Sequence, residues 1–232
     1  QQRLVARRGW DLDLVADEER HGPVAPAGCV DDAGEIPGID AIAHAVESAV
    51  TRRGNELSRL FSREAFRLMA SAFPQILAHP SDVGARAGMQ LGAAHAGTAI
   101  ELSMLGAAHS AANPLTAHFG MIHGQAVGLM LPHVVRFNAQ EPATAARYRE
   151  LAVAGGLAAP ADPTVAAVAG LSAWIRLQLD QAGLFCSLAD LGLTREAVPA
   201  LAAEAAGQWT AGFNPRAITA PDFEQLYQAA LS

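Results

Sequence analysis

The sequence predicts an all-α fold, a multi-helix bundle of about eight to ten helices that begins near residue 38. Apolar residues recur there with a period close to 3.6, and no stretch alternates as a strand does. Hydrophobic residues make up 51% of the 232 residues and charged residues 17%, which indicates a sizeable core. We expect helices over 40–51, 56–77, 82–104, 142–155, 163–182, 194–207 and 221–231, and helical Ala-rich runs at 106–112 and 124–138.

The first predicted helices show the clearest signals. Ile42 and Val46 lie four residues apart and share a helix face. The second helix is expected to end before Pro80, and Asp82 to cap the third. Pro114 lies between the two Ala-rich runs, and Pro132 lies inside the second. The apolar stripe of the second helix, which we expect to be buried, comprises Leu57, Leu60, Phe61, Phe66, Leu68, Met69 and Phe73.

Residues 1–37 differ from the rest of the chain. They are rich in Asp and Glu and are interrupted by Pro and Gly, which predicts a mostly irregular, acidic lead-in to a helical domain over 38–232. The chain has no initiator Met and no apolar signal segment, so we expect a piece of a longer protein. No glycine-rich turn follows a strand and opens a helix, so the sequence lacks the pattern of a dinucleotide-binding loop.

Composition narrows the classes of partner. The formal net charge of −7 argues against nucleic acid or an anionic membrane surface as the main partner. No apolar run reaches the roughly 18 residues that a membrane-spanning helix needs. The two cysteines, Cys29 and Cys186, are far apart and form no metal or disulfide pattern, so a reducing cytoplasm is the expected compartment.

One acid and three histidines form a candidate metal site. Asp40 and His44 lie four residues apart on one helix face, and His109 and His123 flank Ala- and Gly-rich segments that can pack closely against it. A carboxylate with three imidazoles suits Fe(II) or Zn(II), and without thiolates it favours an open catalytic site. Each signal alone has a simpler interpretation, because a helical Asp–His pair is commonly a surface pair or cap and a lone His109 is commonly a core residue.

Longer motifs surround these residues. Residues 38–47 read GIDAIAHAVE, residues 106–115 read GAAHSAANPL, and IHGQA at 122–126 is followed by LPHV at 131–134. These blocks, with Trp209-Thr210 and FNPR at 213–216, resemble the helical C-terminal domain of iron-containing (group III) alcohol dehydrogenases. The resemblance covers roughly residues 38–232.

The resemblance implies a function and a ligand set. It makes Asp40, His44, His109 and His123 the metal ligands of a catalytic domain. It implies interconversion of a small alcohol and an aldehyde, in which Fe(II) or Zn(II) polarises the substrate oxygen while hydride passes to or from NAD(P). Maleylacetate reductases and glycerol dehydrogenases are variants of the family, so the substrate stays open.

Two further residues are catalytic candidates. Asn113 stands where many members of that family carry a second histidine, and it can hydrogen-bond but cannot titrate near neutral pH. The alternative is that Asn113 caps a turn before Pro114. Glu101 lies in an otherwise apolar segment, where a buried acid would tune the site or pair with a neighbour.

The nucleotide-binding α/β domain that precedes the helical domain in this family is absent from the sequence. We therefore expect a truncated or rearranged gene product, or an isolated domain. Two alternatives to an active oxidoreductase follow: a catalytically silent metal-binding protein, or a chain whose partner supplies the nucleotide domain. The face left by the missing domain is the expected surface for that partner or for a homo-oligomer.

Overall fold

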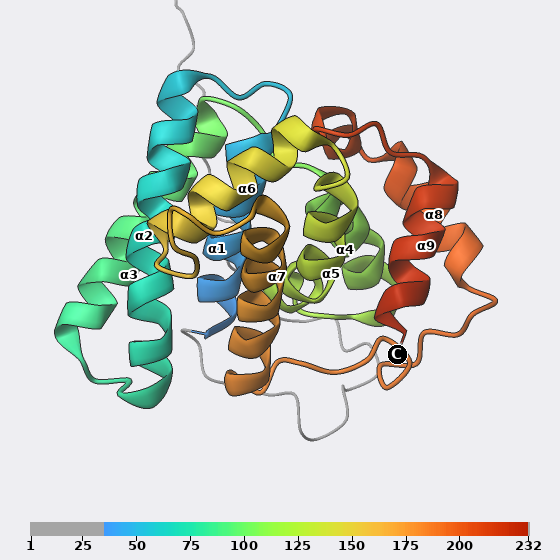
Figure 1. Cartoon of the computed structure of the whole chain (residues 1–232). Coiled ribbons are helices and arrows are strands. Elements are labelled where there is room, and N and C mark those ends of the chain that lie inside the picture. Colours follow the sequence, from blue (N-terminus) through green and yellow to red (C-terminus); the bar gives the residue numbers. More distant parts are fainter. Residues whose placement is uncertain (1–34, 232) are drawn as a thin grey trace, which may run out of the picture.

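The computed structural model describes residues 35–231, which form helices and connecting loops with no strand among them (Figure 1). The predicted all-α fold is therefore confirmed, whereas most of the acidic lead-in lies outside the described residues. The helices are α1 (Glu35–Val50), α2 (Glu56–Ala78), α3 (Val83–Glu101), α4 (Ala107–Phe119), α5 (His123–Asn138), α6 (Pro142–Ala154), α7 (Thr164–Gln181), α8 (Val198–Gly207), the 3₁₀ helix η2 (Trp209–Phe213) and α9 (Ala220–Ala230).

Several helix boundaries differ from the sequence expectation. Helix α1 begins at Glu35, within the region expected to be irregular. The helix expected from 194 begins only at Val198, with a proline in its first turn, where a missing N–H costs nothing. Helix α3 ends at Glu101 rather than near 104, and the Ser103 hydroxyl donates to the Ala99 carbonyl just beyond the helix end.

The first Ala-rich run forms a longer helix than expected, because α4 continues past Ala112 and through Pro114 to Phe119. Proline removes one backbone hydrogen bond from a helix interior, but the neighbours Ala111, Ala112 and Leu115 are fully buried and hold the helix in place. Gly120 ends α4 in the left-handed conformation, at φ 63°, which glycine adopts without strain. Tertiary packing thus outweighs the local preference of proline here.

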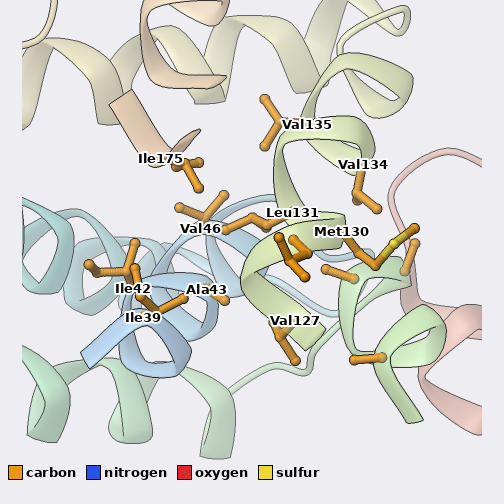
Figure 2. Close-up of a cluster of buried hydrophobic side chains, with 14 of the residues drawn as sticks. Ile39, Ile42, Ala43, Val46, Val127, Met130, Leu131, Val134, Val135 and Ile175 are labelled. Atoms are coloured by element: carbon orange, nitrogen blue, oxygen red, sulfur yellow. The ribbon is translucent and has the colours of Figure 1, made fainter. Parts of the chain in front are cut away.

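Helix α1 lies at the centre of the fold and packs against α2, α3, α5 and α6. Figure 2 shows the apolar residues of α1 facing those of α5, with Ile175 of α7 alongside. Gly128 lets α5 approach, because a Cβ there would lie 2.5 Å from Ile39 Cγ2 and 2.8 Å from a Leu179 methyl carbon. The labelled contacts involve Ile39, Ile42, Ala43 and Val46 of α1 and Val127, Met130, Leu131, Val134 and Val135 of α5.

Burial along α1 locates the site. Between residues 38 and 51, every residue is buried except Asp40 and His44, which are partly exposed. A helix that is buried on all sides belongs in a core, so two partly exposed residues one turn apart mark an opening in the packing.

Two smaller observations complete the fold. Leu57 and Leu60 of α2 are each 52% exposed, so the expectation that they belong to the core is wrong, whereas Phe66, Met69 and Phe73 are buried. Among the described residues, no helix is long and apolar enough to span a bilayer.

Candidate metal centre

The centre is built on one turn of α1. Asp40 and His44 are four residues apart, so the helix places both side chains on one face, and His44 Nε2 lies 3.4 Å from Asp40 Oδ2. Both side chains are about a quarter exposed, at 24% and 26%. The pair therefore faces an opening from which a small molecule can approach.

Helices α4 and α5 bring two more histidines to this turn. His109, in the first turn of α4, places Nε2 3.4 Å from Asp40 Oδ1 and stacks on the His44 ring at 5.0 Å between centroids. Ligand atoms of Asp40, His44 and His109 all lie within 4.8 Å of one another. His123, the first residue of α5, lies beside them with its ring centroid 5.4 Å from that of His109, but outside the 4.8 Å cluster.

Burial sets the protonation of two of these rings. It disfavours the charged imidazolium and lowers the pKa of His44 to about 4, despite the opposing effect of Asp40. Burial lowers the pKa of His123 for the same reason. Burial acts to raise the pKa of Asp40, but His109 and the other two histidines outweigh it and hold that pKa below its ordinary value. At neutral pH the site therefore offers one anionic carboxylate and two neutral imidazoles, the forms that bind metal.

His109 has the opposite balance. Burial favours its neutral form, but the carboxylates of Asp40 and Glu47 on either side raise its pKa to about 9. Its Nε2 atom and Asp40 Oδ1 are both buried and neither forms a hydrogen bond. Two inward-facing buried polar atoms without partners are unusual in a folded protein, and a cation between them would satisfy both. The residues present therefore fit a Fe(II) or Zn(II) ion.

Glu47 is the neighbour for which the sequence assigned no role. It is 3% exposed, and its Oε2 lies 2.6 Å from His109 Nδ1. The signal available was its place as the last residue of the 38–47 motif, one turn beyond His44.

The structure places the two catalytic candidates, Asn113 and Glu101, in different surroundings. Asn113 lies within α4, one turn after His109, and its amide donates a 3.0 Å hydrogen bond to Gln208 Oε1, so the idea that it caps a turn is wrong. Glu101 is exposed at the C-terminal end of α3, so the expected burial is wrong. Ala96 and Ala99 take up the buried face of that helix instead.

The C-terminal motif at residues 209–216 contacts both α4 and α5. Thr210 Oγ1 and Ser110 Oγ lie 2.7 Å apart, and Asn214 Oδ1 accepts from the backbone N–H of Ala107. Arg216 donates to the Phe137 carbonyl and stacks over the Phe137 ring. These contacts attach the C-terminal segment to the two helices that carry His109 and His123.

Comparisons with known proteins found enzymes and solved structures that this chain resembles. Lactaldehyde reductase of Escherichia coli K12 is 34% identical over 194 residues, covering 83% of this chain and 50% of the reductase. The 1,3-propanediol dehydrogenase of Klebsiella pneumoniae is 30% identical over 194 residues, covering 83% and 49%. The solved structure of a 1,3-propanediol oxidoreductase superposes with a TM-score of 0.80 at 28% identity, covering 84% of this chain and 51% of that one.

A second solved structure includes a cofactor. Sulfoacetaldehyde reductase from Bifidobacterium kashiwanohense, in complex with NAD⁺, superposes with a TM-score of 0.75 at 25% identity, covering 85% of this chain and 50% of that one. The chain thus spans about half the length of the relatives it matches. Residues 36–231 match the C-terminal region of the Fe-containing alcohol dehydrogenases, and the chain belongs to that family.

Proposed function

We propose that this chain is the metal-binding half of an NAD(P)-dependent oxidoreductase that interconverts a small alcohol and an aldehyde. The observation that supports this most is the pair of buried atoms without hydrogen bonds, Asp40 Oδ1 and His109 Nε2, beside the partly exposed turn of α1 that carries Asp40 and His44. The named relatives, a lactaldehyde reductase and a propanediol dehydrogenase, act on small oxygenated substrates of this kind.

Asp40, His44, His109 and His123 would hold the ion. When bound, a divalent Fe or Zn ion supplies Lewis acidity toward a substrate oxygen. Asp40 contributes the negative charge, and His44 and His123 contribute neutral nitrogens without first losing a proton. The partial exposure of Asp40 and His44 leaves a side open for substrate, as a catalytic site requires.

Asn113 would act by orientation rather than by proton transfer. Its amide N–H is engaged by Gln208, which leaves the side-chain oxygen as an acceptor for a substrate hydroxyl or a cofactor amide. An asparagine carries no titratable proton near neutral pH, so any proton relay in this protein would use another group. Nothing in the surroundings of Glu101 supports a catalytic role for it.

Nicotinamide binding would need residues beyond the metal centre. The described residues contain no strand, and so no strand–turn–helix loop for a dinucleotide. The alternative function, a metal-binding protein without redox activity, shares the same metal site. Titration with NAD(H) and NADP(H) on metal-loaded protein separates the two: association supports the oxidoreductase, and metal retention without association supports the silent protein.

The direct test is elemental analysis of three purified proteins: the parent, His109→Ala and His118→Ala. His118 is a matched control because it is an exposed histidine on the same helix, paired with Glu204 outside the metal centre. We expect one equivalent of iron or zinc in the parent and in His118→Ala, and none in His109→Ala. A parent protein without metal after anaerobic reconstitution would contradict the proposed site.

A further inference from the structure

We propose that Glu47 is a positioning residue that fixes the orientation of His109, so that its Nε2 atom points at the ion position. This inference rests on the proposed metal site but adds a residue to it. Glu47 lies beside His109 on the side away from Asp40 and has no place among the ligands themselves.

The hydrogen bonds of Glu47 hold the His109 ring in one orientation. Its two oxygens accept from Gly106 N–H at 3.2 Å, from Ala108 N–H at 2.7 Å and from His109 Nδ1 at 2.6 Å. An ionised carboxylate only accepts hydrogen bonds, so Nδ1 must carry the proton that it donates. In the neutral ring, Nε2 is then the free nitrogen, and Nε2 is the atom that faces Asp40. A carboxylate behind a ligating histidine commonly plays this role in metal sites.

The same carboxylate completes the N-terminus of α4. The first N–H groups of a helix have no partner within it, and the cap residue Gly106 has no side chain to offer. Glu47 accepts from two of these groups, where a negative charge is also favoured by the helix dipole. A Cβ on Gly106 would lie 3.1 Å from Glu47 Oε1, so glycine leaves room for the carboxylate. The orientation of His109 is thereby tied to the start of the helix that carries it.

Asn214 provides a separate hold on the same helix start. Its Oδ1 accepts from Ala107 N–H at 3.3 Å and from Asn138 Nδ2 at 2.9 Å, and its own amide donates to Asn138 Oδ1 at 2.7 Å. Asn214 forms its hydrogen bonds with Ala107, Asn138 and the Arg216 carbonyl, and not with His109. Loss of Asn214 therefore weakens the anchoring of α4 while leaving the Glu47–His109 bond in place, which makes it a matched control for a purely structural role.

Glu47→Gln is the informative substitution because it keeps the shape and changes the chemistry. Glutamine has one acceptor oxygen and an NH₂ group that only donates. If the NH₂ faces His109, Nδ1 becomes an acceptor and the ring proton moves to Nε2, where it competes with the ion. If the NH₂ faces the backbone instead, two donors meet, because the NH₂ then points at the N–H of Ala108 and cannot accept its hydrogen bond. In both cases we expect metal affinity to fall roughly 10- to 100-fold.

The experiment compares the parent with Glu47→Gln and Asn214→Ala in a Zn²⁺ competition titration, with urea unfolding of the metal-free proteins. We expect Glu47→Gln to lose affinity and Asn214→Ala to lose stability while binding Zn²⁺ nearly as the parent does. Equal affinity in Glu47→Gln and the parent would overturn the inference, as would an equal loss in Asn214→Ala. If Asn214→Ala does not fold, Asn138→Ala takes its place as the control. This substitution removes the pairing with Asn214 and changes no residue of α4.

A second readout needs no metal. The short, buried bond from His109 Nδ1 to Glu47 should give a downfield imidazole proton resonance in metal-free protein. We expect the resonance in the parent and in Asn214→Ala, and its loss or a clear upfield shift in Glu47→Gln, because a neutral amide oxygen accepts a weaker hydrogen bond than a carboxylate does. Its absence from the parent would contradict the inference even if Zn²⁺ binds. Conversely, failure of the parent to bind Zn²⁺ with the resonance present would contradict the proposed function and leave the Glu47–His109 contact established.

Discussion

His109 and His133 lie in two regions of the same helical bundle and have opposite electrostatics. His109 lies between the carboxylates of Asp40 and Glu47, which outweigh burial and raise its pKa to about 9. His133 lines a cavity of about 420 Å³ between α5 and α7, with Arg136 and Arg176. Burial, followed by these two guanidinium groups, lowers the pKa of His133 to about 4. The charges around each ring, rather than residue type or burial alone, decide which histidine carries a proton.

The difference separates a site that attracts cations from one that repels them. At His109 the surplus negative charge is buried and local, which suits a divalent ion. At His133, burial and two positive neighbours together keep the ring neutral, and a metal ion would meet two guanidinium groups. A histidine therefore indicates a metal site only when its partners in space are known.

The largest effect that we expect from this contrast is acid destabilisation through His133. Its pKa is about 4 in the folded state and about 6.5 when unfolded, so between these values the unfolded chain binds a proton that the folded chain does not. Stability is therefore retained above pH 6.5 and falls as the pH drops toward 4, by up to about 3 kcal/mol. Urea unfolding at pH 7.5 and pH 4.5 measures this loss.

His133→Gln isolates the contribution of that ring. Other groups also titrate in this range, His44 among them, so the parent loses stability in acid for several reasons. The variant should lose less between the two pH values than the parent does, because it lacks the proton uptake of residue 133. The same loss in both proteins would show that His133 is already solvated in the folded state.

A smaller effect tests whether the arginines contribute to the His133 environment. Arg136→Gln removes one of the two positive charges that oppose protonation of the ring, so the pKa of His133 should rise toward its usual value. Arg136 is exposed, so the fold should tolerate the change. An NMR titration of His133 in both proteins measures the shift, with Arg86→Gln on α3 as a control. An unchanged titration would show that Arg136 does not contribute and would leave burial and Arg176 as the causes of the shift.

The sequence predicted the helices well because their signal is local. Apolar periodicity located α1 and α2, and the spacing of Asp40 and His44 showed that they share a face. The partners of His109 depend on tertiary packing, since Glu47 is 62 residues away along the chain. The path of α4 through Pro114 also depends on packing, because full burial of its neighbours outweighs the missing backbone bond. The expectation that Glu101 is buried was wrong because an apolar stretch of sequence does not show which face of a helix the acid occupies.

The smallest expected effect concerns a third histidine, His118, whose Nε2 lies 2.7 Å from Glu204 at the surface. The contact is nearly as short as the one between His109 and Glu47, but both side chains are well exposed, at 53% and 40%. Water screens such a pair, so Glu204→Gln should change the free energy of unfolding by less than about 1 kcal/mol and leave metal content unchanged. Urea unfolding and elemental analysis measure both quantities. A loss well above that value would mean that distance alone governs these pairs, and the contrast drawn from burial and neighbouring charge would then be wrong.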